Sequence, residues 1–191
     1  MNVFTVLSSL YTAVTGRLSD PVVSLVSIGL ATSSYVFFTQ FGALSFGPVA
    51  FATERKEVIS EVPECIELWG FYTDRASIRI SAAAILSCLS FLAAARSLDP
   101  SKFDVQQLLH INATVAFSVF PWVITIMLPT YKKLWSFRDR ISRKTSDNYI
   151  LTSGESQDAM DCIDHWKTLN LVRVAIGFTA WFLAFIVLLL V

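Results

Sequence analysis

The chain has 191 residues, of which 54% are hydrophobic, with 15 Lys or Arg against 15 Asp or Glu and a mean hydropathy of +0.57. This composition excludes an ordinary soluble domain and favours a small integral membrane protein. The formal net charge of zero gives no electrostatic support for nucleic-acid binding. Only two histidines are present and the three cysteines lack metal-ligand spacing, which excludes a multi-histidine metal site.

Four apolar segments long enough to cross a bilayer follow one another along the chain. Asp20-Pro21 is a typical helix start, and no charged residue follows until Glu54. Pro121 is expected to kink the third segment. We predict spans over about 21–48, 76–97, 105–131 and 168–191, with polar loops over 54–75 and 132–167. The basic first part of the second loop, Lys132–Lys144, is expected to continue the third helix beyond the membrane.

The distribution of positive charge predicts the orientation of these spans. Four crossings place both polar loops on one side, and the positive-inside rule makes that side cytosolic. Twelve cations lie on it, against three (Arg17, Arg96 and Lys102) on the other side. The twelve are Arg55, Lys56, Arg75, Arg79, Lys132, Lys133, Arg138, Arg140, Arg143, Lys144, Lys167 and Arg173.

The predicted fold is therefore all-α: one domain over 1–191, an integral membrane four-helix bundle with a long cytosolic loop between the third and fourth helices. The protein is expected to be multi-pass, in contact with membrane lipid, in the endoplasmic reticulum or another endomembrane.

The start of the last helix carries the most informative polar residues. Trp166, Asn170 and Arg173 are spaced i, i+4 and i+7, so a helix places them on one face. Guanidinium and amide groups at this depth are either snorkelling anchors or members of a site. His165 beside them is a candidate general base, although a solvated histidine is the simpler interpretation.

The topology brings further residues to the same cytosolic depth. Gln40 lies near the end of the first span, Trp69, Tyr72 and Arg75 precede the second, and Tyr131 ends the third. A bundle interior lined by aromatic rings and a few polar groups suits a flat aromatic ligand. The alternative interpretation is an aromatic belt at the membrane interface, with arginines as anchors.

Several motifs resemble those of a family of small four-helix membrane proteins that includes the fungal anthrone oxygenases. The two more specific ones are Leu128-Pro129-Thr130-Tyr131-Lys132-Lys133-Leu134 at the end of the third helix and Trp166-Lys167-Thr168-Leu169-Asn170-Leu171-Val172-Arg173 at the start of the fourth. Gly29–Pro48 and Trp69-Gly70-Phe71-Tyr72 accompany them. The resemblance covers roughly 22–191.

This resemblance implies a monooxygenase of fungal secondary metabolism that oxidises an aromatic polyketide, an anthrone, to an anthraquinone with O₂ as co-substrate and no cofactor or metal. It implies that Arg173 and Asn170 steady an oxyanion and that His165 or Asp164 acts as base. Trp69, Tyr72 and Trp166 would stack on the substrate, with Arg75 beside them. Other enzymes of a polyketide pathway are the expected protein partners.

Two other classes of function compete with an enzyme. A non-catalytic membrane scaffold would hold a biosynthetic complex through its basic segment, Lys132–Lys144. A small transporter subunit is disfavoured because no charged residue lies in the middle of a predicted span, where an ion site would need one.

Overall fold

The computed structural model describes residues 16–45, 47, 50, 62–144 and 151–191, and in them it is all-α. The helices are α2 (Pro21–Ser45), α4 (Val62–Ser97), α5 (Phe103–Trp122), α6 (Leu128–Lys144) and α7 (Ser153–Leu190). The short 3₁₀-helix η1 (Pro100–Lys102) precedes α5, and the π-helix η2 (Val123–Met127) joins α5 to α6. Four helical stretches are long and apolar enough to cross a membrane.

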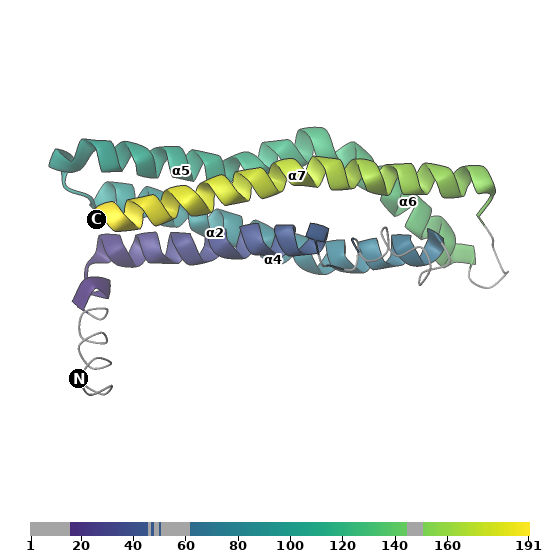
Figure 1. Ribbon diagram of the computed structural model, residues 1–191, viewed down its shortest axis with the longest axis horizontal. Helices are drawn as coiled ribbons and strands as arrows, with labels where there is room; N and C mark the ends of the chain where they lie inside the picture. The colour runs from purple at the N-terminus through teal and green to yellow at the C-terminus, as the bar shows by residue number, and fades with distance from the viewer. Residues whose placement is uncertain (1–15, 46, 48–49, 51–61, 145–150) are drawn as a thin grey trace, which may run out of the picture.

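The four long stretches form an up-and-down antiparallel bundle, in which α2 and α5 each pack against both α4 and α7. Figure 1 shows the start of α2 and the end of α7 at one end of this bundle. The predicted helix start is confirmed, because Asp20 accepts a hydrogen bond from the backbone N–H of Val22 at 2.7 Å.

The helices α4 and α7 extend well beyond the predicted spans. They have 36 and 38 residues, which correspond to about 54 and 57 Å, against about 30 Å for a bilayer core. Residues 62–75, 132–144 and 153–167 are helical. The continuation of the third helix over 132–144 is confirmed, and the prediction of loops over 62–75 and 153–167 is wrong; 54–61 and 145–150 lie outside the described residues.

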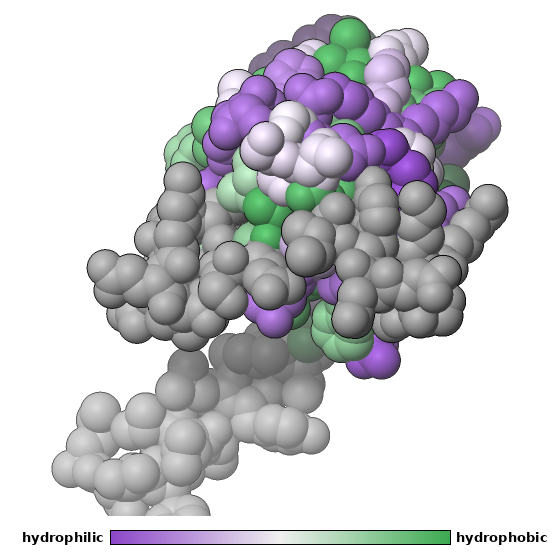
Figure 2. Space-filling model, turned by 90° about the vertical axis from the view of Figure 1, so that its right-hand side faces the viewer, coloured by the Kyte–Doolittle hydropathy of each residue, from purple (hydrophilic) through white to green (hydrophobic). Residues whose placement is uncertain are grey.

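An apolar stripe explains these extensions. Residues such as Ile66, Leu134, Phe137 and Ile163 recur at helical spacing within the polar segments and are buried. Their polar neighbours remain on the surface, and hydrophilic residues gather on the described surface of this end of the bundle (Figure 2). The polar segments are therefore amphipathic helices.

Candidate functional site

A buried aromatic cluster lies where α4, α6 and the first half of α7 meet. Trp69 of α4 is 0% exposed and Trp166 of α7 is 1% exposed, with their rings edge to face at a centroid distance of 6.3 Å. Tyr131 and Trp135 of α6 also contact the Trp69 ring and stack on each other at 5.6 Å; Tyr131 is buried, whereas Trp135 is 38% exposed and forms the outer edge of the cluster. These rings define the aromatic cluster, which requires three helices far apart in the sequence.

A glycine on α4 allows α6 to approach this closely. A Cβ at Gly70 would lie 2.7 Å from Arg138 Nε, so the absence of a side chain at Gly70 lets the Arg138 side chain lie directly across α4. Arg138 donates from Nη1 to Asp74 Oδ2 at 2.6 Å, and its Nε lies 3.8 Å from Glu67 Oε2. These contacts of Arg138 hold α6, which carries Tyr131 and Trp135, against α4, which carries Trp69.

The helix disturbance expected at Pro121 takes the form of the π-helix η2. Proline has no N–H to donate and its ring crowds the preceding turn, and a π-turn absorbs the change by adding a residue to the turn. Met127 is buried just before α6 begins. Trp122 Nε1 donates to the backbone oxygen of Leu169 at 3.3 Å, which ties this irregular segment to α7.

Arg173 is the charged centre of the site. Its side chain is buried, with the residue 8% exposed, and Nη1 donates to Tyr131 Oη at 3.2 Å and to Asn170 Oδ1 at 3.1 Å. Both acceptors are neutral. Within the described ranges the ion pairs join Arg138 to Glu67 and Asp74 and Arg140 to Glu155, and none includes Arg173. A buried charge without a counter-ion is costly, so this site favours an anionic ligand.

Hydrogen-bond donors outnumber acceptors around Arg173. Within the described residues, the buried atoms without a hydrogen-bond partner include four donors of this cluster: Trp69 Nε1, Trp166 Nε1, Asn170 Nδ2 and Arg173 Nε. Buried polar atoms are rarely left unpaired in proteins. A ligand rich in oxygen acceptors would satisfy these donors.

Gln40 of α2 is a fifth polar group at this depth. It is 0% exposed, and neither Nε2 nor Oε1 has a partner. A Cβ at Gly177 of α7 would lie 3.2 Å from Phe37 Cα, which fixes the register of the two helices. The helices α2 and α7 run antiparallel, so moving along α2 from Phe37 to Gln40 corresponds to moving back along α7 from Gly177 to Val174 or Arg173. Gln40 therefore lies at about the same depth in the bundle as Arg173.

A cavity of about 180 Å³ opens beside Arg173 between α4 and the segment from α5 to α6. Its polar lining consists of Thr73, Ser77, Ser81, Tyr131 and Arg173. The Thr73 hydroxyl also lacks a partner. In the described part of the chain, no group of three His, Cys, Asp or Glu residues could hold a metal ion.

The structure brings together four of the seven predicted site residues, Trp69, Trp166, Asn170 and Arg173. Tyr72 lies at the edge of the cluster, half-buried, with its ring 6.4 Å from that of Trp166. Two residues lie outside it. His165 is exposed, and Arg75 is exposed with its guanidinium 4.3 Å from the centroid of the Phe71 ring.

Sequence reasoning placed Gln40 and Tyr131 at this depth but did not include them in the site, and it missed Thr73 and Trp135. The signal for Gln40 was available, because it is the one amide in an otherwise uncharged helix of 25 residues. The π-helix hides the direction of Tyr131, since it breaks the 3.6-residue period before that residue.

In the described residues these features define a class of protein: an apolar antiparallel bundle of four long helices, with aromatic walls at one end and a buried guanidinium there that is bonded to neutral acceptors. The sequence model of the anthrone oxygenase family matches residues 69–183, which include Trp69, Tyr131, Trp166 and Arg173. The chain belongs to the anthrone oxygenase family. No curated protein and no solved structure matches it significantly.

Proposed function

We propose that this protein oxidises a polyketide anthrone to the corresponding anthraquinone with O₂, in fungal secondary metabolism and without a cofactor. The observation that carries this proposal is the buried Arg173, whose hydrogen-bond acceptors are both neutral. Removal of a proton from the central CH₂ of an anthrone gives an aromatic, phenolate-like anion. Arg173 is suited to binding the oxygen of that anion, with Asn170 Nδ2 and the two indole N–H groups as further donors.

The reaction balances without another reductant. O₂ accepts two electrons from the anion and bonds to its central carbon, which yields a peroxide at that carbon. Loss of the second C–H proton and cleavage of the O–O bond then form the new carbonyl and release water. One anthrone and one O₂ thus give one anthraquinone and one H₂O. The protein has to bind the anion, exclude bulk water and shape the cavity.

The route of the first proton is a separate proposal. His165 and Asp164 are exposed on α7, whereas Trp166 next to them is buried. We therefore propose that the proton leaves through water at the mouth of the site, with His165 accepting it from water and not directly from the substrate. Arg173 makes this possible because its charge lowers the free energy of the anion relative to the neutral anthrone.

The setting follows the sequence predictions. We propose a multi-pass protein of the endoplasmic reticulum or another endomembrane, with the amphipathic ends of α4, α6 and α7 on the cytosolic side, beside the other enzymes of a polyketide pathway. The exposed Lys132 and Lys133 on α6 would face anionic lipid or those enzymes.

Oxygen uptake by membranes is the decisive experiment. Membranes carrying the wild-type protein should consume O₂ and convert a simple methyl-substituted anthrone to a coloured quinone, with one O₂ used per quinone formed. Membranes with Arg173→Met at the same protein level should show the rate of empty membranes. Equal rates in all three preparations would favour the scaffold, which should instead lose its partner enzymes when Lys132 and Lys133 are replaced.

A further inference from the structure

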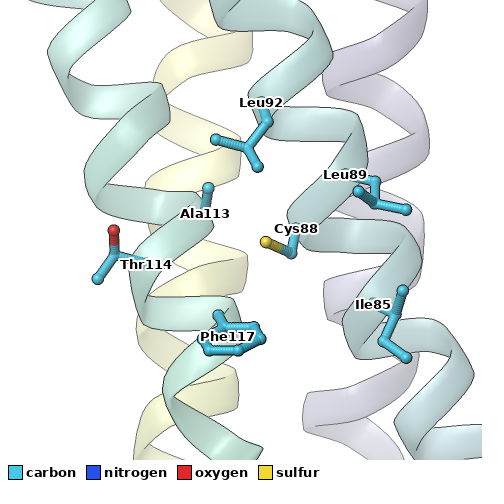
Figure 3. A pocket seen from close by; sticks show the side chains of 7 residues that line it. All are labelled: Ile85, Cys88, Leu89, Leu92, Ala113, Thr114 and Phe117. Atoms are coloured by element: carbon cyan, nitrogen blue, oxygen red, sulfur yellow. The ribbon is translucent and has the colours of Figure 1, made fainter.

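Two hollows follow one another along the seam between α4 and α5. The first is the 180 Å³ cavity beside Arg173, and the second has a volume of about 420 Å³. Figure 3 shows the second hollow, in which Cys88 and Leu92 of α4 point toward α5. The residues that line it are Ile85, Cys88, Leu89, Leu92, Ala113, Thr114 and Phe117.

The same stripe of each helix lines both hollows. On α5, Ala113 and Phe117 line the second hollow and Phe120 lines the first, at helical spacings of i, i+4 and i+7, and Ile124 of η2 continues the lining of the first. On α4 the lining continues from Ser81 to Ile85, one turn further on. Phe117 lines the second hollow and Phe120 the first, and their ring centroids are 5.6 Å apart, so this aromatic pair separates the two hollows. We name the seam that holds both hollows the α4–α5 groove.

Small side chains create the second half of this groove. Ala113 and Cys88 stand where α4 and α5 face each other, and neither fills the space between the helices. The walls beside them, Leu89 and Phe117, are more than half exposed. The groove is therefore open at its side, where a bilayer would meet the bundle.

Polarity changes from one end of the groove to the other. Arg173, Tyr131 and Thr73 provide charged and polar groups at the first hollow. In the second hollow the Thr114 hydroxyl already donates to the backbone oxygen of His110 at 2.9 Å, and the other side chains except the Cys88 thiol are hydrocarbon. This gradient matches a ligand with an oxygen-rich aromatic head and a hydrocarbon chain.

Resting on the oxidation proposed above, we propose that the substrate is an anthrone that carries an alkyl or acyl chain, and that this chain lies in the α4–α5 groove. The ring system takes the position beside Arg173, and the chain runs past Phe117 and Phe120 toward Leu92. Phe117 is exposed and can turn aside, so the aromatic pair separates the two halves only when the chain is absent.

The expected benefit of the chain is orientation. Lipid tails are as apolar as the groove, so moving a chain from lipid into it gains little hydrophobic free energy. A chain held along the seam fixes the rotation of the flat ring about Arg173, and it thereby presents the same carbon to O₂ in each encounter. Filling the groove should therefore affect chain-bearing substrates selectively.

Competition between two substrates measures this selectivity. A methyl-anthrone and an octyl-anthrone are compared in wild type, in Cys88→Phe and in the matched control Ala82→Phe, which adds the same ring on the exposed face of α4. The different membrane partition of the two substrates cancels when the ratio of kcat/KM for octyl over methyl is compared between variants. This ratio should fall at least tenfold in Cys88→Phe and stay at the wild-type value in Ala82→Phe.

A second variant that fills the groove separates a blocked groove from loss of folding. Leu92→Trp enlarges a half-open side chain that points toward α5 in the same hollow, and it should reproduce the fall in the ratio (Figure 3). A ratio that is unchanged in both filled variants, or equal losses for the two substrates in them, would overturn the assignment of the groove. Turnover of methyl-anthrone by wild type would still support the oxidation itself.

Photolabelling distinguishes a substrate chain from an ordinary lipid tail without requiring turnover. An anthraquinone whose octyl chain ends in a diazirine should label residues 85–92 and 113–117, and excess octyl-anthraquinone should suppress that label. A phospholipid with a diazirine at its acyl end should label the outer surface, with no such suppression. Equal labelling of the groove by both probes, unaffected by the competitor, would show that lipid alone occupies it.

Discussion

Arg173 of α7 donates a hydrogen bond to the hydroxyl oxygen of Tyr131 at the start of α6, at 3.2 Å, across 42 residues of sequence. The phenol oxygen is an acceptor in this contact, so the phenol proton remains available to a ligand oxygen. Together with Asn170, this pair defines a donor-rich centre surrounded by Trp69 and Trp166.

Replacing Arg173 with Met should separate stability from activity. The substitution removes a buried charge and keeps much of the side-chain volume, so thermal unfolding in detergent should occur at the wild-type temperature or above it. Oxidation should fall by about 10²–10³-fold, the loss typical of a missing oxyanion donor. Arg75→Met is the matched control, because Arg75 is exposed. A large loss of stability in Arg173→Met with wild-type activity would contradict an anion-binding role.

Tyr131→Phe should isolate the contribution of one hydroxyl. The ring that stacks on Trp135 stays in place, and only the hydrogen bond to Arg173 is lost. Hydrogen bonds to charged groups contribute about 1.5–3 kcal/mol, which corresponds to a loss of roughly tenfold to a hundredfold in kcat/KM. Steady-state oxidation rates measure this. An unchanged kcat/KM would show that the hydroxyl does not serve the reaction.

Gln40→Leu should stabilise the protein and weaken binding. The wild-type amide is fully buried with neither polar atom paired, and an unpaired buried polar group costs about 1–3 kcal/mol. The leucine variant should therefore unfold at a higher temperature and should bind the anthraquinone product less tightly. Gln106→Leu is the comparison, because Gln106 donates to the backbone oxygen of Ala95 at 3.2 Å and its loss should not stabilise. Destabilisation by Gln40→Leu would mean that its amide has a structural partner.

Gly70→Ala should loosen the site from a distance. The added Cβ would push aside the end of the Arg138 side chain, whose partly exposed contacts with Asp74 and Glu67 are each worth up to about 1 kcal/mol. Arg138→Ala removes the obstacle, so the double variant should be less destabilised than the sum of the two single variants. The measurement is the unfolding temperature of the wild type, the two single variants and the double variant, which together form a double-mutant cycle. Additive effects would show that Gly70 and Arg138 do not act on each other.

His165→Ala should have a small effect, within about threefold on kcat/KM, because an exposed histidine that takes a proton from water can be replaced by buffer. Activity lost in His165→Ala should return when the imidazole concentration of the buffer is raised. A loss comparable to that of Arg173→Met, with no rescue, would indicate direct proton transfer to His165.

Local patterns determined the helical part of this protein. The apolar segments predicted four long helices, Asp20-Pro21 marked the start of one, and the i, i+4, i+7 spacing placed Trp166, Asn170 and Arg173 on one face. All three are buried in the structure. Such features depend on helical geometry, which is set within a few residues of the chain.

Tertiary packing decided the rest. His165 and Trp166 are neighbours in sequence, and only the position of α4 and α6 determines that Trp166 is buried and His165 exposed. The same packing made helices of the polar segments, since their apolar stripes find partners only when α4, α6 and α7 meet. Tyr131 reaches Arg173, and Gln40 reaches the same depth, through helix contacts that no local period specifies.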